Sequence, residues 1–134
     1  MCTNSTNTTY DKVYLAQNKI IRELADKENC VIVGRCADYI LKDKPDCLKV
    51  FIFSDEKSRE KRILEQYGEI SGKTIQQRIT ENDQRRKLYY KHYTGTDWGI
   101  MRNYHLSIDS NVVGIERSCR MDCISLLTTV NQIR

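Results

Sequence analysis

A dense set of basic side chains between residues 74 and 93 is the first feature of this sequence that could do chemistry. The cations of that stretch are Arg78, Arg85, Arg86, Lys87 and Lys91. Arginine and lysine bind phosphate groups, and basic residues interleaved with tyrosines also bind single-stranded nucleic acid. A charge-rich helix is in the simplest case only a solvated face, so the residues alone leave these alternatives open.

The segment Gly68–Thr74 comes close to a phosphate-binding loop but misses the pattern. The motif G-x-x-x-x-G-K-[ST] needs a glycine at the position that Tyr67 occupies, and Gly68 is one residue too close. A phosphate loop also follows a buried strand, whereas a charged helix precedes this segment. Thr74 and Gln77 instead fit a capping box, in which each side chain binds the other's backbone N–H. The sequence therefore predicts a helix, a turn and a second helix here.

The six cysteines and two histidines show no metal-binding spacing. No C-x-x-C pair occurs, and His92 and His105 lie far from the cysteines, so we predict no metal site. The polar N-terminus has no apolar signal core, and residues 1–9 are expected to be disordered. Reduced thiols and the missing signal predict a cytoplasmic protein.

Length and composition exclude several classes of protein. The chain has 134 residues, 22 Lys+Arg against 18 Asp+Glu, and a net charge of +4. That length suits one domain, and a 30% charged fraction with mixed signs excludes a membrane protein. The small positive charge does not by itself indicate a nucleic-acid partner.

Hydrophobic periodicity predicts helices alternating with strands. We expect helices over residues 10–27, 37–41, 55–67, 74–93 and 115–130, and strands over residues 30–33, 48–53 and 104–108. Strands separated by helices pair in parallel through right-handed crossovers. The continuous apolar run Cys30–Val33 is typical of a strand buried on both faces of such a sheet. The fold class predicted is α/β.

Four segments together resemble the bacterial cytidylate kinase-like family, relatives of the nucleoside monophosphate kinases. They are CVIVGRCADYIL at 30–41, LKVFIFS at 48–54, DQRRKLYYKHYTGTDWG at 83–99 and NYHLSIDS at 103–110. The resemblance runs from about Tyr10 to the end and implies a three-layer α/β/α P-loop kinase fold over residues 10–134, with a lid over about 68–99. It also implies transfer of the γ-phosphate of ATP, with Mg²⁺, to a nucleoside monophosphate such as CMP or dCMP.

The resemblance also implies roles for particular residues. Gly34 and Arg35 match the Gly-Arg at the acceptor site, where Arg35 would hold the acceptor phosphate. Arg85 and Arg86 would stabilise the transferring phosphoryl group from the lid, because phosphoryl transfer depends on positioning and charge neutralisation. The further substrate-binding candidates are Arg59, Arg62, Lys87 and Trp98.

The sequence departs from the family pattern in three places. Phe53 stands where the family carries an aspartate, and Asn82 where an arginine is usual. The family's N-terminal phosphate-loop strand and helix do not precede Tyr10. We therefore expect a C-terminal portion of the fold whose sheet lacks its central strand, with weak or no kinase activity alone and self-association through an exposed sheet edge.

Two alternatives remain beside a phosphotransferase. One is a non-catalytic module that binds nucleotide or phosphate through Arg35 and the basic helix. The other, less favoured, is an RNA-binding protein that uses the basic and aromatic residues of 85–91.

Overall fold

The computed structural model describes residues 9–68 and 72–121. The chain divides into two compact units, Met1–Lys44 and Pro45–Arg134. The predicted disordered segment, residues 1–9, lies outside the described residues except for Thr9, which begins the first helix. The prediction of one domain over residues 10–134 stays a prediction.

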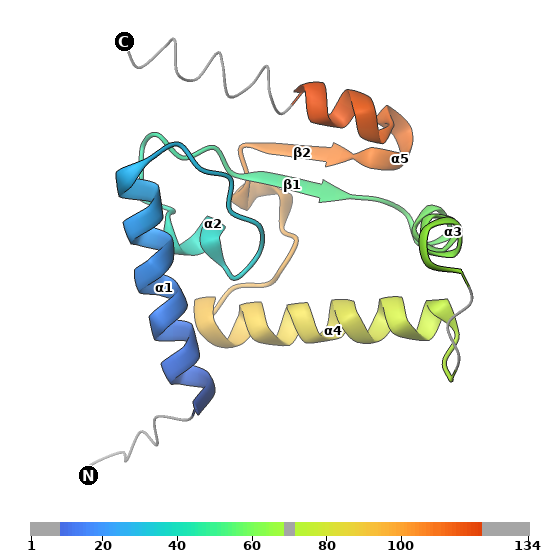
Figure 1. Cartoon of the computed structure of the whole chain (residues 1–134), viewed down its shortest axis with the longest axis horizontal. Helices are drawn as coiled ribbons and strands as arrows, with labels where there is room; N and C mark the ends of the chain where they lie inside the picture. The colour runs from blue at the N-terminus through green and yellow to red at the C-terminus, as the bar shows by residue number, and fades with distance from the viewer. Residues whose placement is uncertain (1–8, 69–71, 122–134) are drawn as a thin grey trace. The chain divides into compact units, whose positions relative to one another are not determined.

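The first unit consists of a long helix and a short one that lie side by side (Figure 1). They are α1 (Thr9–Lys27) and α2 (Ala37–Ile40), and both confirm the predicted helices to within a residue at each end. Ile21 of α1 is buried, as are Ala37, Ile40 and Leu41 in and after α2. Burial of these apolar side chains stabilises the unit, because apolar surface removed from water is the main favourable term in folding.

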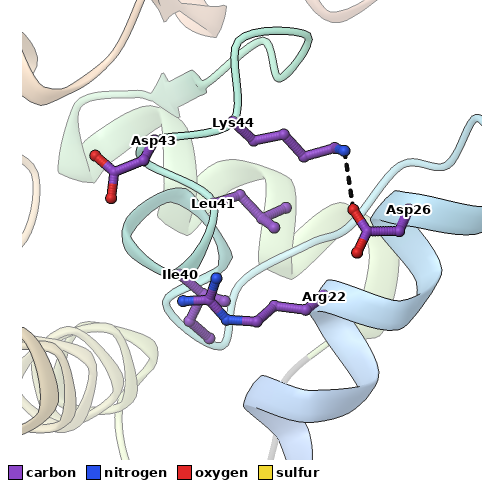
Figure 2. A pocket seen from close by; sticks show the side chains of 6 residues that line it. All are labelled: Arg22, Asp26, Ile40, Leu41, Asp43 and Lys44. Carbon is purple, nitrogen blue, oxygen red and sulfur yellow. Dashed lines mark hydrogen bonds and ion pairs between the residues drawn. The ribbon is translucent and has the colours of Figure 1, made fainter.

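A hollow of about 210 Å³ lies between α1 and the turn that follows α2. Its lining residues are Arg22, Asp26, Ile40, Leu41, Asp43 and Lys44 (Figure 2). Lys44 donates from Nζ to Asp26 Oδ1 at 3.1 Å across its mouth. None of the predicted site residues lines this hollow.

The strand predicted at Cys30–Val33 is wrong. These residues belong to no strand, and Val31 and Val33 are 84% and 87% exposed. A strand exists only where a neighbour accepts and donates its backbone hydrogen bonds, and no described residue does so for this segment. The apolar, β-branched composition was therefore not sufficient to make a strand.

The second unit contains a parallel pair of strands, β1 (Val50–Phe53) and β2 (Leu106–Asp109). Val50 is opposite Leu106 and Phe53 is opposite Asp109, so the two strands end together (Figure 1). Both confirm predicted strands, and their pairing is parallel as expected. Among the described residues the sheet has these two strands and not the three predicted.

Local capping signals set the bounds of the two long helices of this unit. In α3 (Glu56–Tyr67), the Asp55 carboxylate accepts from Ser58 N at 3.0 Å, and Gly68 ends the helix. In α4 (Ile75–Thr94), Thr74 and Gln77 form the predicted capping box, with N···O distances of 3.1 and 3.2 Å. Both helices confirm the prediction.

Short elements complete the second unit. The 3₁₀ turn η1 (Met101–Asn103) precedes β2, and α5 (Ser110–Val113) follows it. The Asp109 side chain caps α5, accepting from Asn111 N at 2.9 Å. Of the helix predicted over 115–130, residues 115–121 are helical, and the remainder lies outside the described residues.

An aromatic cluster packs beside β1. The ring of Phe51 lies 4.9 Å from that of Tyr104 and 5.6 Å from that of Trp98, measured between centroids. Gly99 has φ +80°, and a Cβ at that position would stand 3.2 Å from the Phe51 ring. The cluster holds Trp98 against Phe51 of β1.

Candidate functional site

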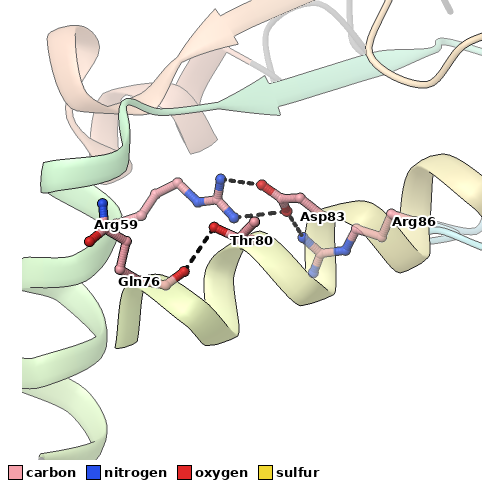
Figure 3. Close-up of polar contacts among 5 residues, drawn as sticks. All are labelled: Arg59, Gln76, Thr80, Asp83 and Arg86. Atoms are coloured by element: carbon pink, nitrogen blue, oxygen red, sulfur yellow. Dashed lines mark hydrogen bonds and ion pairs between the residues drawn. The ribbon is translucent and has the colours of Figure 1, made fainter. Parts of the chain in front are cut away.

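Two of the predicted site arginines converge on one carboxylate. Arg59 of α3 donates from Nη1 and Nη2 to the two Asp83 oxygens at 2.6 and 2.9 Å. Arg86, which follows Asp83 by three residues on α4, donates from Nη1 to Asp83 Oδ1 at 3.1 Å (Figure 3). The fork-to-fork contact with Arg59 is the strong geometry for an arginine–carboxylate pair. We call these three residues the arginine fork.

The electrostatics of the fork favour the charged states of Asp83 and Arg59. Burial raises the pKa of Asp83, but the hydrogen bond and charge of Arg59, together with Arg86, outweigh it, and the pKa lies below its ordinary value. The hydrogen bond from Arg59 to Asp83 raises the pKa of that guanidinium further. The fork is therefore a fixed arrangement of two cations around one anion near neutral pH.

Trp98 lies close to the guanidinium of Arg86. The guanidinium carbon of Arg86 is 5.9 Å from the centroid of the Trp98 ring, within the range of a cation–π contact. Trp98 is also the single tryptophan of the chain. The second unit thus brings together three predicted site residues: Arg59, Arg86 and Trp98.

Arg85 is separate from the fork. Successive residues of a helix are about 100° apart, so Arg85 and Arg86 project in different directions. Arg85 lines a hollow of about 310 Å³ with Lys73, Arg78, Glu81 and Asn82. Lys73 donates to both Glu81 oxygens, at 2.6 and 2.8 Å, which lowers the pKa of Glu81. We call this the basic hollow; it carries three cations against one carboxylate.

Lys87 and Arg62 join neither group. Lys87 is exposed and, two residues beyond Arg85, lies on the opposite side of α4. Arg62 follows Arg59 on α3 and is half-buried. Neither makes a hydrogen bond or ion pair with a described residue, so their roles stay predictions.

Gly34 and Arg35 belong to the first unit and form a left-handed turn before α2. Gly34, Arg35 and Cys36 have φ values of 73°, 56° and 58°, and Ala37 N donates to Gly34 O at 3.1 Å. A residue with a Cβ pays roughly 1–2 kcal/mol for this conformation, so the turn stores strain at Arg35 and Cys36. Arg35 is exposed on this turn.

The Cys36 thiol is not activated as a nucleophile, and the described residues hold no metal-binding cluster. Burial, with a smaller contribution from Asp38, raises the pKa of the Cys36 thiol to about 11, so it stays protonated near neutral pH. No His, Cys, Asp and Glu side chains within 9–68 and 72–121 gather in a group that could hold a metal ion.

Asp83 is a functional candidate that no motif in the sequence indicated. Its spacing to Arg86, three residues along one helix, was a weak signal in the sequence. Its contact with Arg59 spans 24 residues and depends on how α3 packs on α4. Three tyrosines of the same helix, α4, have contacts within the protein: Tyr90 is buried, and Tyr89 packs against Tyr93 with ring centroids 4.7 Å apart. These contacts leave the tyrosines less available to stack on the bases of an RNA.

Comparison with known proteins places the chain in a family. The model of the cytidylate kinase-like family matches residues 1–112. A crystal structure of an uncharacterized protein from Eubacterium ventriosum is similar at 30% identity and a TM-score of 0.71, covering 88% of this chain and 68% of that one. The comparison with curated proteins gave no match.

The chain belongs to the cytidylate kinase-like family. The family resemblance inferred from the four sequence segments is confirmed, although the match begins at residue 1 and ends at residue 112. The observed architecture, helices with a parallel strand pair, agrees with an incomplete α/β kinase-like fold. Within the described ranges, no helix has the length and apolar character needed to span a bilayer.

Proposed function

We propose that this chain binds a nucleoside monophosphate of the CMP or dCMP class and takes part in phosphoryl transfer to it from ATP. The fold proposed for this activity is the three-layer α/β/α P-loop kinase fold. In this proposal β1 and β2 are two strands of its central sheet. Family membership supports a nucleotide substrate. The choice of CMP or dCMP as the acceptor, and the transfer of a phosphoryl group to it, are what we propose beyond family membership.

The convergence of Arg59 and Arg86 is the observation that carries the proposal. The two guanidinium groups come from different helices, yet both lie within 3.1 Å of one carboxylate oxygen pair. Each guanidinium has five N–H donors, and the fork uses two on Arg59 and one on Arg86. The remaining donors suit a phosphate, which arginine binds through two parallel hydrogen bonds.

Arg85 and the basic hollow give a second place for an anion on α4. All five lining residues are charged or polar, and Arg85 makes no hydrogen bond or ion pair with a described residue. The hollow suits a phosphate of the donor nucleotide, and Arg35, on its strained turn, is the alternative to the fork as the group that holds the acceptor phosphate. Lys87 and Arg62 are exposed or half-exposed cations that would add to the local positive potential.

ATP and Mg²⁺ are the co-reactants that family membership implies. Mg²⁺ in such reactions is held chiefly by the phosphates with one or two carboxylates and water, so a preformed protein cage is not needed. The cations of the fork and hollow fit a polyphosphate. Bound Mg²⁺ would neutralise part of the phosphate charge. The cations of the fork and the hollow would orient the phosphates, while Asp83 keeps the guanidinium groups of Arg59 and Arg86 in place.

Calorimetry with CMP and ATP tests the proposal directly. Arg86→Gln should weaken CMP binding roughly 10-fold or more, because a charge-assisted hydrogen bond contributes about 1.5–3 kcal/mol. Arg117→Gln, which removes one charge from an exposed position of the helix 115–121, is the matched control and should change the affinity less than about twofold. Absence of CMP binding, or equal effects of the two variants, would contradict the proposal.

A coupled assay of ADP release separates transfer from binding. ATP-dependent turnover with CMP, even slow, supports a phosphotransferase. CMP binding without ATP binding or turnover would instead favour the non-catalytic nucleotide-binding alternative. Oligonucleotide binding that falls steeply with salt would be required to support the RNA-binding alternative.

We further propose that the isolated chain self-associates. Val31 and Val33 are exposed in a segment that belongs to no strand, and no described residue pairs with its backbone in a sheet. Such a segment can add to a strand of another copy.

A further inference from the structure

We propose that Asp83 is a positioning residue, which holds Arg59 and Arg86 at one place so that their remaining N–H groups receive the phosphate together. This inference rests on the proposed function, because it specifies how the arginine fork would bind the ligand. No motif in the sequence assigned Asp83 a role.

The donor geometry leaves both arginines able to bind while they stay on Asp83. Arg59 gives the carboxylate its two terminal nitrogens, so its Nε–H and two further hydrogens remain. Arg86 gives only Nη1 and keeps one whole edge of its guanidinium. Asp83 thus needs no displacement when a phosphate arrives.

Burial shows which member of the fork faces outward. The side chains of Asp83 and Arg59 are 19% and 29% exposed, whereas that of Arg86 is 58% exposed. The carboxylate is therefore the covered member of the fork, and Arg86 is its accessible cation. This order fits a carboxylate that anchors the arginines and not one that meets the ligand itself.

Positioning strengthens phosphate binding because an unrestrained arginine side chain is flexible. An arginine side chain has many rotamers, and part of this conformational freedom is lost when it binds a ligand. The Arg86 guanidinium has two restraints: its hydrogen bond to Asp83 at 3.1 Å and the ring of Trp98, whose centroid is 5.9 Å from the guanidinium carbon. Binding groups already held in place lose less freedom when the ligand arrives, which strengthens binding and orients the phosphate.

The first test replaces the carboxylate and keeps its shape. Asp83→Asn should weaken CMP binding about 10-fold, measured by calorimetry. The matched control is Glu65→Gln, which makes the same charge change on α3 at an exposed carboxylate outside the fork. The control should change the affinity less than about twofold. Unchanged or tighter binding by Asp83→Asn would overturn the inference, because it would mean that Asp83 merely competes with the ligand for the arginines.

A double-mutant cycle distinguishes positioning from a general loss of structure. If Asp83 acts through Arg86, then Asp83→Asn should have less than about a twofold effect in a chain that already carries Arg86→Gln. Additive effects would overturn the inference. Asp83→Glu should recover part of the wild-type affinity, since it keeps a carboxylate that can reach the arginines.

The fluorescence of Trp98 tests the same inference without any ligand. Trp98 is the single tryptophan, so the emission of the chain reports on the side of Arg86 that faces it. Asp83→Asn should change this emission, Glu65→Gln should not, and the change should disappear in the Arg86→Gln background. If wild-type chain binds no CMP, the proposed function fails while this measurement still decides whether Asp83 positions Arg86; an unchanged emission in Asp83→Asn would overturn the inference.

Discussion

The Arg59–Asp83 ion pair links two helices that bury few apolar side chains. No residue of α3 is fully buried, and Ile79 is the buried aliphatic residue of α4. Removing Arg59 leaves a largely covered carboxylate with one partner fewer. We expect Arg59→Ala to lower the free energy of unfolding by about 1–2 kcal/mol, because both side chains are only partly screened by water.

Urea denaturation measures this loss. Lys61→Ala is the matched control, since the Lys61–Glu65 pair is 3.9 Å long and its side chains are 78% and 64% exposed. The control should change stability by less than about 0.5 kcal/mol. Equal losses in both variants would show that the fork does not stabilise the contact between α3 and α4.

Acid should weaken the fork. The pKa of Asp83 lies below that of an unfolded aspartate despite burial, since Arg59 and Arg86 favour the carboxylate. A carboxyl group with a lowered pKa in the folded state adds stability above its unfolded pKa of about 3.9, and loses it as the pH falls through the folded value. Wild-type chain should therefore lose more stability than Asp83→Asn between about pH 5 and about pH 2.

Denaturation at several pH values checks this expectation. Below about pH 5, the free energy of unfolding should fall less steeply with pH in Asp83→Asn than in the wild type. It should still fall, because Ser58 lowers the pKa of Asp55 and Lys73 lowers the pKa of Glu81. Parallel curves for wild type and Asp83→Asn would contradict the assigned ion pair.

At the scale of elements, the turn after α4 depends on a glycine beside the aromatic cluster. Gly99 combines φ +80° with a position where an added Cβ would stand 3.2 Å from Phe51. Gly95, which ends α4 at φ +72°, has open space around it. Gly95→Ala should cost about 1 kcal/mol for its backbone alone, and Gly99→Ala roughly 1 kcal/mol more because the Phe51 ring must also shift.

Thermal melts together with Trp98 emission separate the two glycine variants. We expect Gly99→Ala to alter the emission, because Trp98 contacts Phe51 edge to face. Gly95→Ala should leave it close to that of wild type. Equal melting temperatures would mean that the Phe51 contact imposes no constraint on this turn.

At the scale of the whole molecule, residues 30–33 should control association between copies. Replacing Val31 and Val33 by serine removes two β-branched side chains that are more than four-fifths exposed. The double variant should shift sedimentation toward the monomer. Lys12→Ser with Lys19→Ser, which changes exposed polar positions on α1, is the control and should leave association unchanged. A wild-type chain that is monomeric at all concentrations would contradict the prediction.

The helices were predictable from the sequence because their limits depend on near neighbours. Asp55 binds Ser58 and Thr74 binds Gln77, so each cap is complete within one turn. Gly68 and Gly95 end α3 and α4 by taking positive φ. The parallel pairing of β1 and β2 also followed, since a crossover containing helices permits that direction.

Only the tertiary structure decided which residues pair with distant partners. The run Cys30–Val33 has the composition of a strand, but a strand needs backbone partners from elsewhere in the chain, and no described residue supplies them. Arg59 and Asp83 meet across 24 residues because α3 packs on α4, a contact that no local pattern specifies. The sequence by itself therefore determined the family, the helices and the chemistry of the basic segment. Packing decided that Arg86 shares a carboxylate with Arg59 while Arg85 lines a different hollow, because ion pairs depend on distance in space and not on separation along the chain.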